Sequence, residues 1–168
     1  MSDSFAAEIQ EAGEHERILE EISNLHKQTI YAHGRIIKEI GGASGIRDEG
    51  ALESALGAPF ATFFGEELLP TPIDKAAALM RSLSLNHPFV DGNKRISLTM
   101  TAYFLLEHGR GFRDDLSDDE MVNFCLEIAE GKKEIEEIAE WLRNNTNGPS
   151  ARSFRKVMEQ FHRLDLVS

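Results

Sequence analysis

Apolar residues recur at helical spacing along most of this chain. Between about residues 16 and 40, apolar residues, mostly isoleucine, fall at helical spacing, which predicts an amphipathic helix. Gly41-Gly42 then ends the helix in the usual C-terminal manner. Asp48 can cap a short helix that runs to Leu56.

Four further helices follow the same pattern and carry their own start and stop signals. Thr71-Pro72-Ile73-Asp74 combines a capping hydroxyl, a proline and a carboxylate, and Ser117-Asp118-Asp119-Glu120 is a capping box. Pro88 ends the first of these helices because the residue before a proline avoids the α conformation. Gly109 and Gly131 end two others. The predicted helices cover about residues 71–86, 93–107, 117–130 and 133–143.

One segment breaks the helical pattern in the middle of the chain. Residues 58–69 contain Pro59-Phe60-Ala61-Thr62-Phe63-Phe64-Gly65. Its aromatic residues and turn glycine predict a short β-hairpin or flap. The expected fold class is therefore all-α, a helical bundle with a small β-hairpin flap.

The C-terminal part differs from the rest in composition. Residues 144–150 read as a linker, and residues 151–166 carry basic side chains and an amphipathic apolar stripe formed by Phe154, Val157, Met158 and Phe161. We therefore expect a catalytic domain over residues 1–145. Residues 146–168 are expected to form a linker and a basic C-terminal helix.

The chain is acidic overall, because 29 Asp and Glu against 18 Lys and Arg give a formal net charge of -11. Such a surface repels nucleic acid and anionic membranes, so neither is an expected partner. The sequence contains no run of about 18 uncharged apolar residues, and its N-terminus does not resemble a signal peptide. The single cysteine, Cys125, lies in an apolar stretch. A lone cysteine of this kind predicts a buried thiol in a cytoplasmic protein.

Candidate chemistry is concentrated in His87-Pro88-Phe89-Val90-Asp91-Gly92-Asn93-Lys94-Arg95, which leads into a predicted helix. The free N–H groups of a helix N-terminus favour an anion, Gly92 permits close approach of the backbone, and Lys94-Arg95 adds positive charge. Asp91 offers a hard oxygen ligand for Mg²⁺, and His87 can accept a proton near neutral pH. This grouping suits attack of a protein hydroxyl on a nucleotide phosphate.

Residue chemistry alone leaves a second interpretation open. An ordinary helix–loop–helix turn would use His87 as a capping or core histidine and Asp91-Gly92-Asn93 as turn residues. Two further histidines, His26 and His33, are too far apart in sequence to form a metal site without more ligands. We expect both of them at the surface.

The segment from His87 to Arg95 resembles the signature of the Fic/Doc superfamily, H-P-F-x-[D/E]-G-N-[G/K]-R, and matches all eight of its specified positions. Upstream, residues 45–56 resemble the G-x-R-D-x-x-x-L-E-x-A segment of Doc-type proteins. The resemblance covers roughly residues 22–145 and is closest to Doc, or death-on-curing, toxins. It implies a Fic-type helical bundle.

The resemblance also implies roles for the matching positions. His87 would be the general base that activates the acceptor hydroxyl, Asp91 would bind Mg²⁺, and Phe89 would anchor the loop in the core. The flap over residues 60–69 would hold the target peptide by strand addition. The anion-binding loop that receives the nucleotide would consist of Gly92, Asn93, Lys94 and Arg95.

Two positions distinguish this chain from many members of the superfamily. Most Fic adenylyltransferases have glycine where this chain has Lys94, whereas Doc toxins have lysine there, which is associated with a reversed nucleotide and transfer of the terminal phosphate. Many Fic proteins also have an arginine at the position of Leu98, where it pairs with an inhibitory glutamate. Because Leu98 cannot form that pair, self-inhibition of this kind is not expected.

These features together predict a Doc-like toxin that uses ATP and Mg²⁺ to phosphorylate a serine or threonine hydroxyl of a target protein. By resemblance, that target could be elongation factor Tu, and a small antitoxin would neutralise the enzyme by folding around it. The alternatives are a Fic-type protein adenylyltransferase, a catalytically silent Fic-like binding module, and a DNA-binding helical protein suggested by the basic tail. His87 and Asp91 argue against the silent module, and the acidic net charge argues against DNA.

Overall fold

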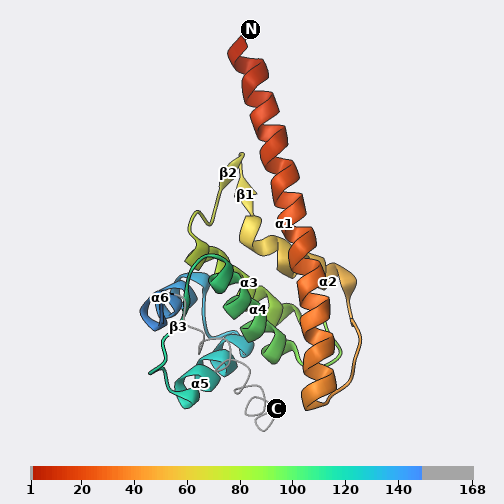
Figure 1. Cartoon of the computed structure of the whole chain (residues 1–168), viewed down its shortest axis with the longest axis vertical. Helices are drawn as coiled ribbons and strands as arrows, with labels where there is room; N and C mark the ends of the chain where they lie inside the picture. Colours follow the sequence, from red (N-terminus) through yellow and green to blue (C-terminus); the bar gives the residue numbers. More distant parts are fainter. Residues whose placement is uncertain (1, 149–168) are drawn as a thin grey trace.

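The computed structural model describes residues 2–148, with side chains from residue 6 onward. This part of the chain forms six α-helices, one short 3-10 helix and two small antiparallel sheets (Figure 1). The predicted all-α bundle with a β-hairpin is therefore confirmed. In chain order the elements are α1 (Ser2–Ile40), α2 (Glu49–Gly57), η1 (Ala58–Phe60), β1 (Thr62–Phe63), β2 (Glu66–Glu67), α3 (Pro72–Asn86), α4 (Asn93–Glu107), β3 (Gly111–Phe112), α5 (Asp118–Ala129), α6 (Ile135–Asn145) and β4 (Thr146–Asn147).

Helices α3 and α4 form the centre of the molecule. Helix α3 packs against α2, α4, α5 and α6, and α4 also contacts α1 and α5. Where the two central helices meet, the Ser84 hydroxyl donates to Ser97 Oγ at 2.8 Å, and Ser97 Oγ donates to the Met80 carbonyl at 2.9 Å. From its third residue, α4 is buried over residues 95–102. The beginning of α4, where the signature segment lies, is thus fixed on the core.

Local capping signals set three helix starts, as predicted. Asp48 Oδ1 accepts the N–H of Ala51 at 2.9 Å, and the Thr71 hydroxyl accepts the N–H of Asp74 at 3.2 Å. Ser117 begins α5 with both hydrogen bonds of a capping box. Each of these bonds satisfies a backbone donor that the first turn of a helix leaves without an intrahelical partner.

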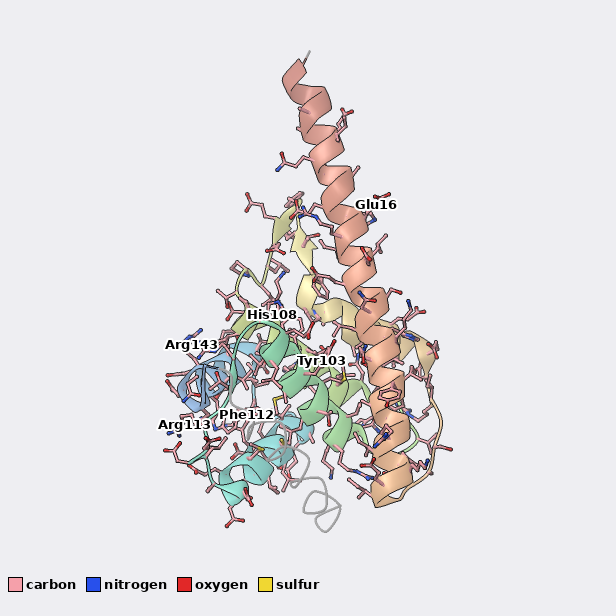
Figure 2. The ribbon with its side chains drawn as sticks, in the orientation of Figure 1. Glu16, Tyr103, His108, Phe112, Arg113 and Arg143 are labelled. Carbon is pink, nitrogen blue, oxygen red and sulfur yellow. The ribbon has the colours of Figure 1, made fainter. Side chains whose placement is uncertain are left out.

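Helix α1 is longer than the sequence pattern indicated. Its C-terminal half packs against α2 and α4, whereas its N-terminal half projects away from the body, and residues 6–17 are exposed (Figures 1 and 2). The predicted start near residue 16 was wrong, because alanine, glutamate and glutamine upstream extend the helix by propensity without an apolar stripe. Within residues 2–148, no helix has the length and hydropathy needed to cross a membrane.

The predicted flap is a two-stranded hairpin that follows η1. Thr62 pairs with Glu67 and Phe63 with Glu66. Phe64 and Gly65 form the turn, with φ of 50° and 80°, as a two-residue hairpin of matching twist requires. The first part of the predicted β segment is instead the η1 turn, in which Pro59 and Phe60 are buried.

The expected linker is partly structured. Asn144 and Asn145 complete α6, and Thr146 pairs with Phe112 in the β3–β4 sheet. Arg110 donates to both the hydroxyl and the carbonyl of Thr146, at 3.0 and 2.8 Å. The linker prediction was therefore wrong for residues 144–147, because this long-range pairing leaves no local sequence signal. The predicted C-terminal helix over residues 151–166 lies outside the described residues.

Candidate functional site

The signature segment between α3 and α4 is paired with the connection between α1 and α2. The N–H of Val90 donates to the carbonyl of Gly45 at 3.0 Å, and the N–H of Arg47 donates to the carbonyl of Pro88 at 2.7 Å. The two segments run antiparallel, as a very short sheet would. The loop that carries the candidate chemistry therefore has backbone support on one side.

His87 is exposed and directly follows the last residue of α3. Its backbone has φ of 45° and ψ of 55°, a left-handed conformation that costs a non-glycine residue about 1–2 kcal/mol. Arg47 stabilises this turn, since its Nε donates to the His87 carbonyl at 2.8 Å and its Nη2 to the Asn86 carbonyl at 3.1 Å. These bonds fix the backbone of the exposed His87.

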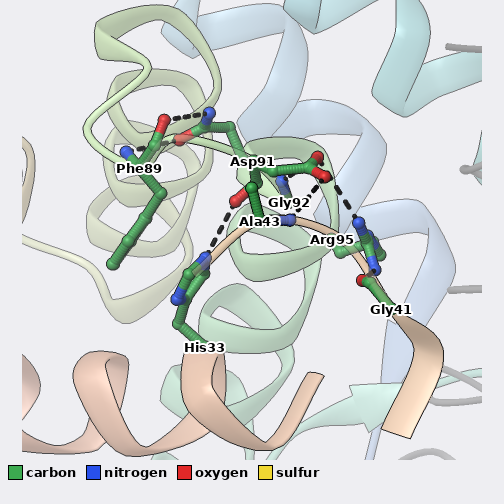
Figure 3. A network of polar contacts seen from close by, with 8 residues as sticks. His33, Gly41, Ala43, Phe89, Asp91, Gly92 and Arg95 are labelled. Atoms are coloured by element: carbon green, nitrogen blue, oxygen red, sulfur yellow. Dashed lines mark hydrogen bonds and ion pairs between the residues drawn. The ribbon is translucent and has the colours of Figure 1, made fainter. Parts of the chain in front are cut away.

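Phe89 and Asn93 close the loop on itself. The N–H of Phe89 donates to Asn93 Oδ1 at 2.9 Å, and Asn93 Nδ2 donates to the Phe89 carbonyl at 3.0 Å (Figure 3). The Phe89 ring is buried in the core, as predicted. Asn93 therefore holds the loop through its side chain.

The Asp91 carboxylate is held by three nitrogen atoms around it (Figure 3). Oδ1 accepts the N–H of Gly92 at 2.6 Å and lies 3.5 Å from Arg95 Nη2, while Oδ2 accepts the N–H of Ala43 at 3.2 Å. Gly42 passes so close that a Cβ there would lie 2.5 Å from Asp91 Oδ2. The side chain is still 45% exposed, so these contacts orient it without enclosing it.

This arrangement fits Mg²⁺ bound by one protein carboxylate. Mg²⁺ in nucleotide sites uses one or two carboxylates together with phosphate oxygens and water, and an ionised carboxylate keeps further lone pairs for a cation. Within residues 2–148, no group of three or more histidine, cysteine, aspartate or glutamate side chains could enclose a metal ion. The donor set therefore suits a metal that arrives with phosphates, and it does not suit a site made by protein ligands alone.

The first turn of α4 has no side-chain cap. Gly92 occupies the N-cap position with φ of 80°, and it has no side chain that could cap the first-turn N–H groups. These groups lack intrahelical partners and carry the positive end of the helix dipole. A phosphate is therefore a suitable ligand for this end of the helix.

The two basic residues of the signature lie in different surroundings. Lys94 is half-buried and close enough to α5 for its charge to act on the Cys125 thiol. The Arg95 side chain is only 3% exposed and donates from Nη1 to the Gly41 carbonyl at 3.1 Å. Arg95 thus ties the end of α1 to the signature loop. Its role in binding a nucleotide stays a prediction.

One residue of this region was not anticipated from the sequence. His33, on α1, is 4% exposed, and its ring stacks on Phe89 with centroids 3.9 Å apart. Its Nε2 lies 2.8 Å from the Asp91 carbonyl oxygen, and burial lowers the pKa of the imidazole. The expectation of a surface position was wrong for His33. Its spacing from the buried residues Leu25 and Ile36 on α1 could have indicated a core position.

The structure brings all the predicted site residues together at one place, the turn from α3 into α4. His87 lies at its start and Asp91 in its middle. The residues of the predicted anion-binding loop come next, and they are Gly92, Asn93, Lys94 and Arg95. Cys125 does not belong to this site. It is buried, as predicted, and burial raises the pKa of its thiol to about 12.

The fold and this turn define a class of protein: a helical bundle in which an exposed histidine begins the loop that leads into an uncapped helix N-terminus. Comparison with known proteins gives the family. The Fic/DOC family model matches residues 15–105. The chain is also 35% identical over 115 residues to Toxin Doc of Mycolicibacterium smegmatis (strain ATCC 700084 / mc(2)155), covering 68% of this chain and 87% of that protein. This protein belongs to the Fic/DOC family, as its signature predicted.

Proposed function

We propose that this protein is a Doc-like toxin, an enzyme that transfers phosphate from ATP to a serine or threonine hydroxyl of a target protein. Members of its family are enzymes that transfer nucleotide-derived groups, and its relative in M. smegmatis is named Toxin Doc. The observation that carries the proposal is the exposed His87 at the start of the loop that leads into the uncapped beginning of α4. Lys94, at the position where adenylyltransferases have glycine, favours transfer of the terminal phosphate.

The proposed reaction is a single phosphoryl transfer. His87 accepts the proton of the acceptor hydroxyl as its oxygen attacks the γ-phosphorus. The bond from phosphorus to the β–γ bridging oxygen breaks, and ADP leaves with that electron pair. The first-turn N–H groups of α4 bind phosphate oxygens, and Lys94 adds positive charge. Asp91 would hold Mg²⁺, which neutralises charge on the phosphates when bound.

The β1–β2 hairpin is the proposed docking place for the target peptide. A two-stranded hairpin has unpaired edges to which an extended peptide can add as a further strand. Its tip carries Phe63, which is 63% exposed, and Phe64, which is 93% exposed. Apolar side chains this exposed are suited to contact a partner. Elongation factor Tu is the proposed target, a small antitoxin the proposed regulator, and the cytoplasm the proposed compartment.

Phosphate labels test the type of transfer. The purified protein is incubated with Mg²⁺, a bacterial lysate and ATP that is labelled at either the α- or the γ-phosphate. We expect one protein to gain label from γ-labelled ATP alone, with a mass increase of one phosphate by mass spectrometry. Label transferred only from the α-phosphate would replace this proposal with AMP transfer.

Two histidine variants test whether the protein is an enzyme. His87→Ala should lower the labelling rate by roughly 10²–10⁴-fold, which is the usual contribution of a general base. His15→Ala, on the exposed N-terminal half of α1, is the matched control and should keep the wild-type rate. If His87→Ala preserves the full effect on cell growth, the catalytically silent binding module becomes the better description.

A further inference from the structure

We infer that His33 is a positioning residue that fixes the Asp91 carboxylate through the peptide unit between Asp91 and Gly92. The carbonyl oxygen of this peptide lies 2.8 Å from His33 Nε2. The N–H of the same peptide donates to Asp91 Oδ1 at 2.6 Å. The inference rests on the proposed function for its consequence in catalysis, since Asp91 is the proposed Mg²⁺ ligand.

The hydrogen-bond partner determines the tautomer of the imidazole. A carbonyl oxygen can only accept, so Nε2 of His33 must carry the hydrogen. The peptide is planar and trans, so its C=O and N–H point in opposite directions. When His33 holds the carbonyl toward α1, the N–H of Gly92 points away from α1, where Asp91 Oδ1 accepts it (Figure 3).

Packing around this peptide leaves it little freedom to turn. A Cβ placed on Gly92 would lie 3.5 Å from Ile37 Cδ1 and 3.6 Å from His33 Nε2, so α1 fits closely against the peptide. Phe89 supports the other side of the imidazole by stacking on it at an interplanar angle of 13°. The ring, the peptide and the carboxylate thus form one rigid chain of contacts from the core to the half-exposed oxygen atoms.

Without the donor at position 33, the Asp91 carbonyl would be left without this partner. A polar group that loses its partner in a buried place is destabilised, so the peptide would rotate to find another one. Rotation would also carry away the Gly92 N–H that orients Asp91. The carboxylate would then sample several orientations, and its affinity for a cation should fall.

Three substitutions separate the hydrogen bond from the packing. His33→Gln and His33→Met are similar in length and flexibility, but only glutamine can donate to the Asp91 carbonyl. His33→Phe keeps an aromatic ring against Phe89 without the donor, and it serves if the methionine variant fails to fold. His26→Leu is the matched control on α1, since it removes a 2.8 Å contact with Glu49, which lies outside the signature segment.

The functional readout is the Mg²⁺ concentration that gives half-maximal transfer at saturating ATP. We expect His33→Met and His33→Phe to raise it at least tenfold. His33→Gln should stay within threefold of wild type, and His26→Leu should match wild type. Equal Mg²⁺ dependence of the glutamine, methionine and phenylalanine variants, at equal thermal stability, would overturn the inference, because a merely structural role would give that result.

A second readout needs no activity. Hydrogen exchange of the Gly92 amide, followed by NMR on the protein without nucleotide, reports the bond to Asp91 Oδ1. Exchange should be at least tenfold faster in His33→Met and His33→Phe than in wild type, and near wild type in His33→Gln. If the wild-type protein transfers no group, the proposed function fails, while unchanged exchange in all three variants would refute the positioning role of His33 by itself.

Discussion

Replacing Asn93 by alanine removes both hydrogen bonds that close the signature loop. The N–H and the carbonyl of Phe89 would lose partners that lie 2.9 and 3.0 Å away in the structure. Leaving one buried polar group unsatisfied costs about 1–3 kcal/mol. Because both groups are only part-buried and water can reach them in the variant, we expect the free energy of unfolding to fall by about 2–4 kcal/mol.

Urea denaturation followed by circular dichroism measures this loss. The slope of unfolding free energy against urea should stay unchanged, since the substitution alters stability and not the surface exposed on unfolding. Asn123→Ala is the matched control, because Asn123 is exposed on α5 and undergoes the same chemical change. It should change stability by less than about 0.5 kcal/mol.

The comparison between these two variants decides the matter. The free energy of unfolding could fall by nearly the same amount in both variants, with a difference below about 1 kcal/mol. The two bonds of Asn93 would then contribute no more than an ordinary exposed pair of hydrogen bonds. The claim that Asn93 holds the loop would then be refuted. A large loss would show that a residue of the signature acts first on the backbone, whatever it also does for a nucleotide.

Three further predictions concern other parts of the molecule. In a γ-phosphate transfer assay, Gly42→Ala should lower the transfer rate at least tenfold, and Gly41→Ala should not. Both positions have φ near +100° to +115°, but only a Cβ at Gly42 would contact Asp91. Equal rates of the two variants would contradict the close approach of Gly42 to Asp91. Cys125 should react with a thiol reagent at pH 8 at least 10³-fold more slowly in the native protein than in urea, since burial raises the pKa of its thiol to about 12. Rapid labelling of the native protein would show that the thiol is accessible. Phe64→Ser should change the free energy of unfolding by less than about 0.5 kcal/mol. It should weaken modification of the target, which raises the target concentration that gives the half-maximal rate. An unchanged concentration would show that the hairpin tip is not part of the docking surface.

Local signals predicted the helices well. Asp48, Thr71 and Ser117 start their helices because a capping side chain bonds to a backbone group only three residues away. What the sequence did not indicate depends on pairs that are distant in the chain. The β3–β4 pairing joins Phe112 to Thr146, and neither two-residue strand is long enough to show an alternating pattern.

The same distinction applies to the candidate site. The signature segment could be found because its residues are contiguous, whereas its supports come from the α1–α2 region far upstream. The contact between His33 and Asp91 spans 58 positions, and that between Arg47 and His87 spans 40. The sequence around Gly42 likewise indicates only the end of a helix. It does not indicate the close approach of Gly42 to Asp91.

The supporting contacts divide the signature segment into two groups of residues. The Phe89 ring is buried in the core, Asn93 bonds to the loop backbone, and Arg95 donates to the Gly41 carbonyl. His87 is exposed, and the Asp91 carboxylate is oriented but half-exposed. In the proposed phosphate transfer, the first group would hold the loop in a fixed shape and the second would meet the substrate. The strict sequence of the signature thus has a structural cause even at positions that need not touch a nucleotide.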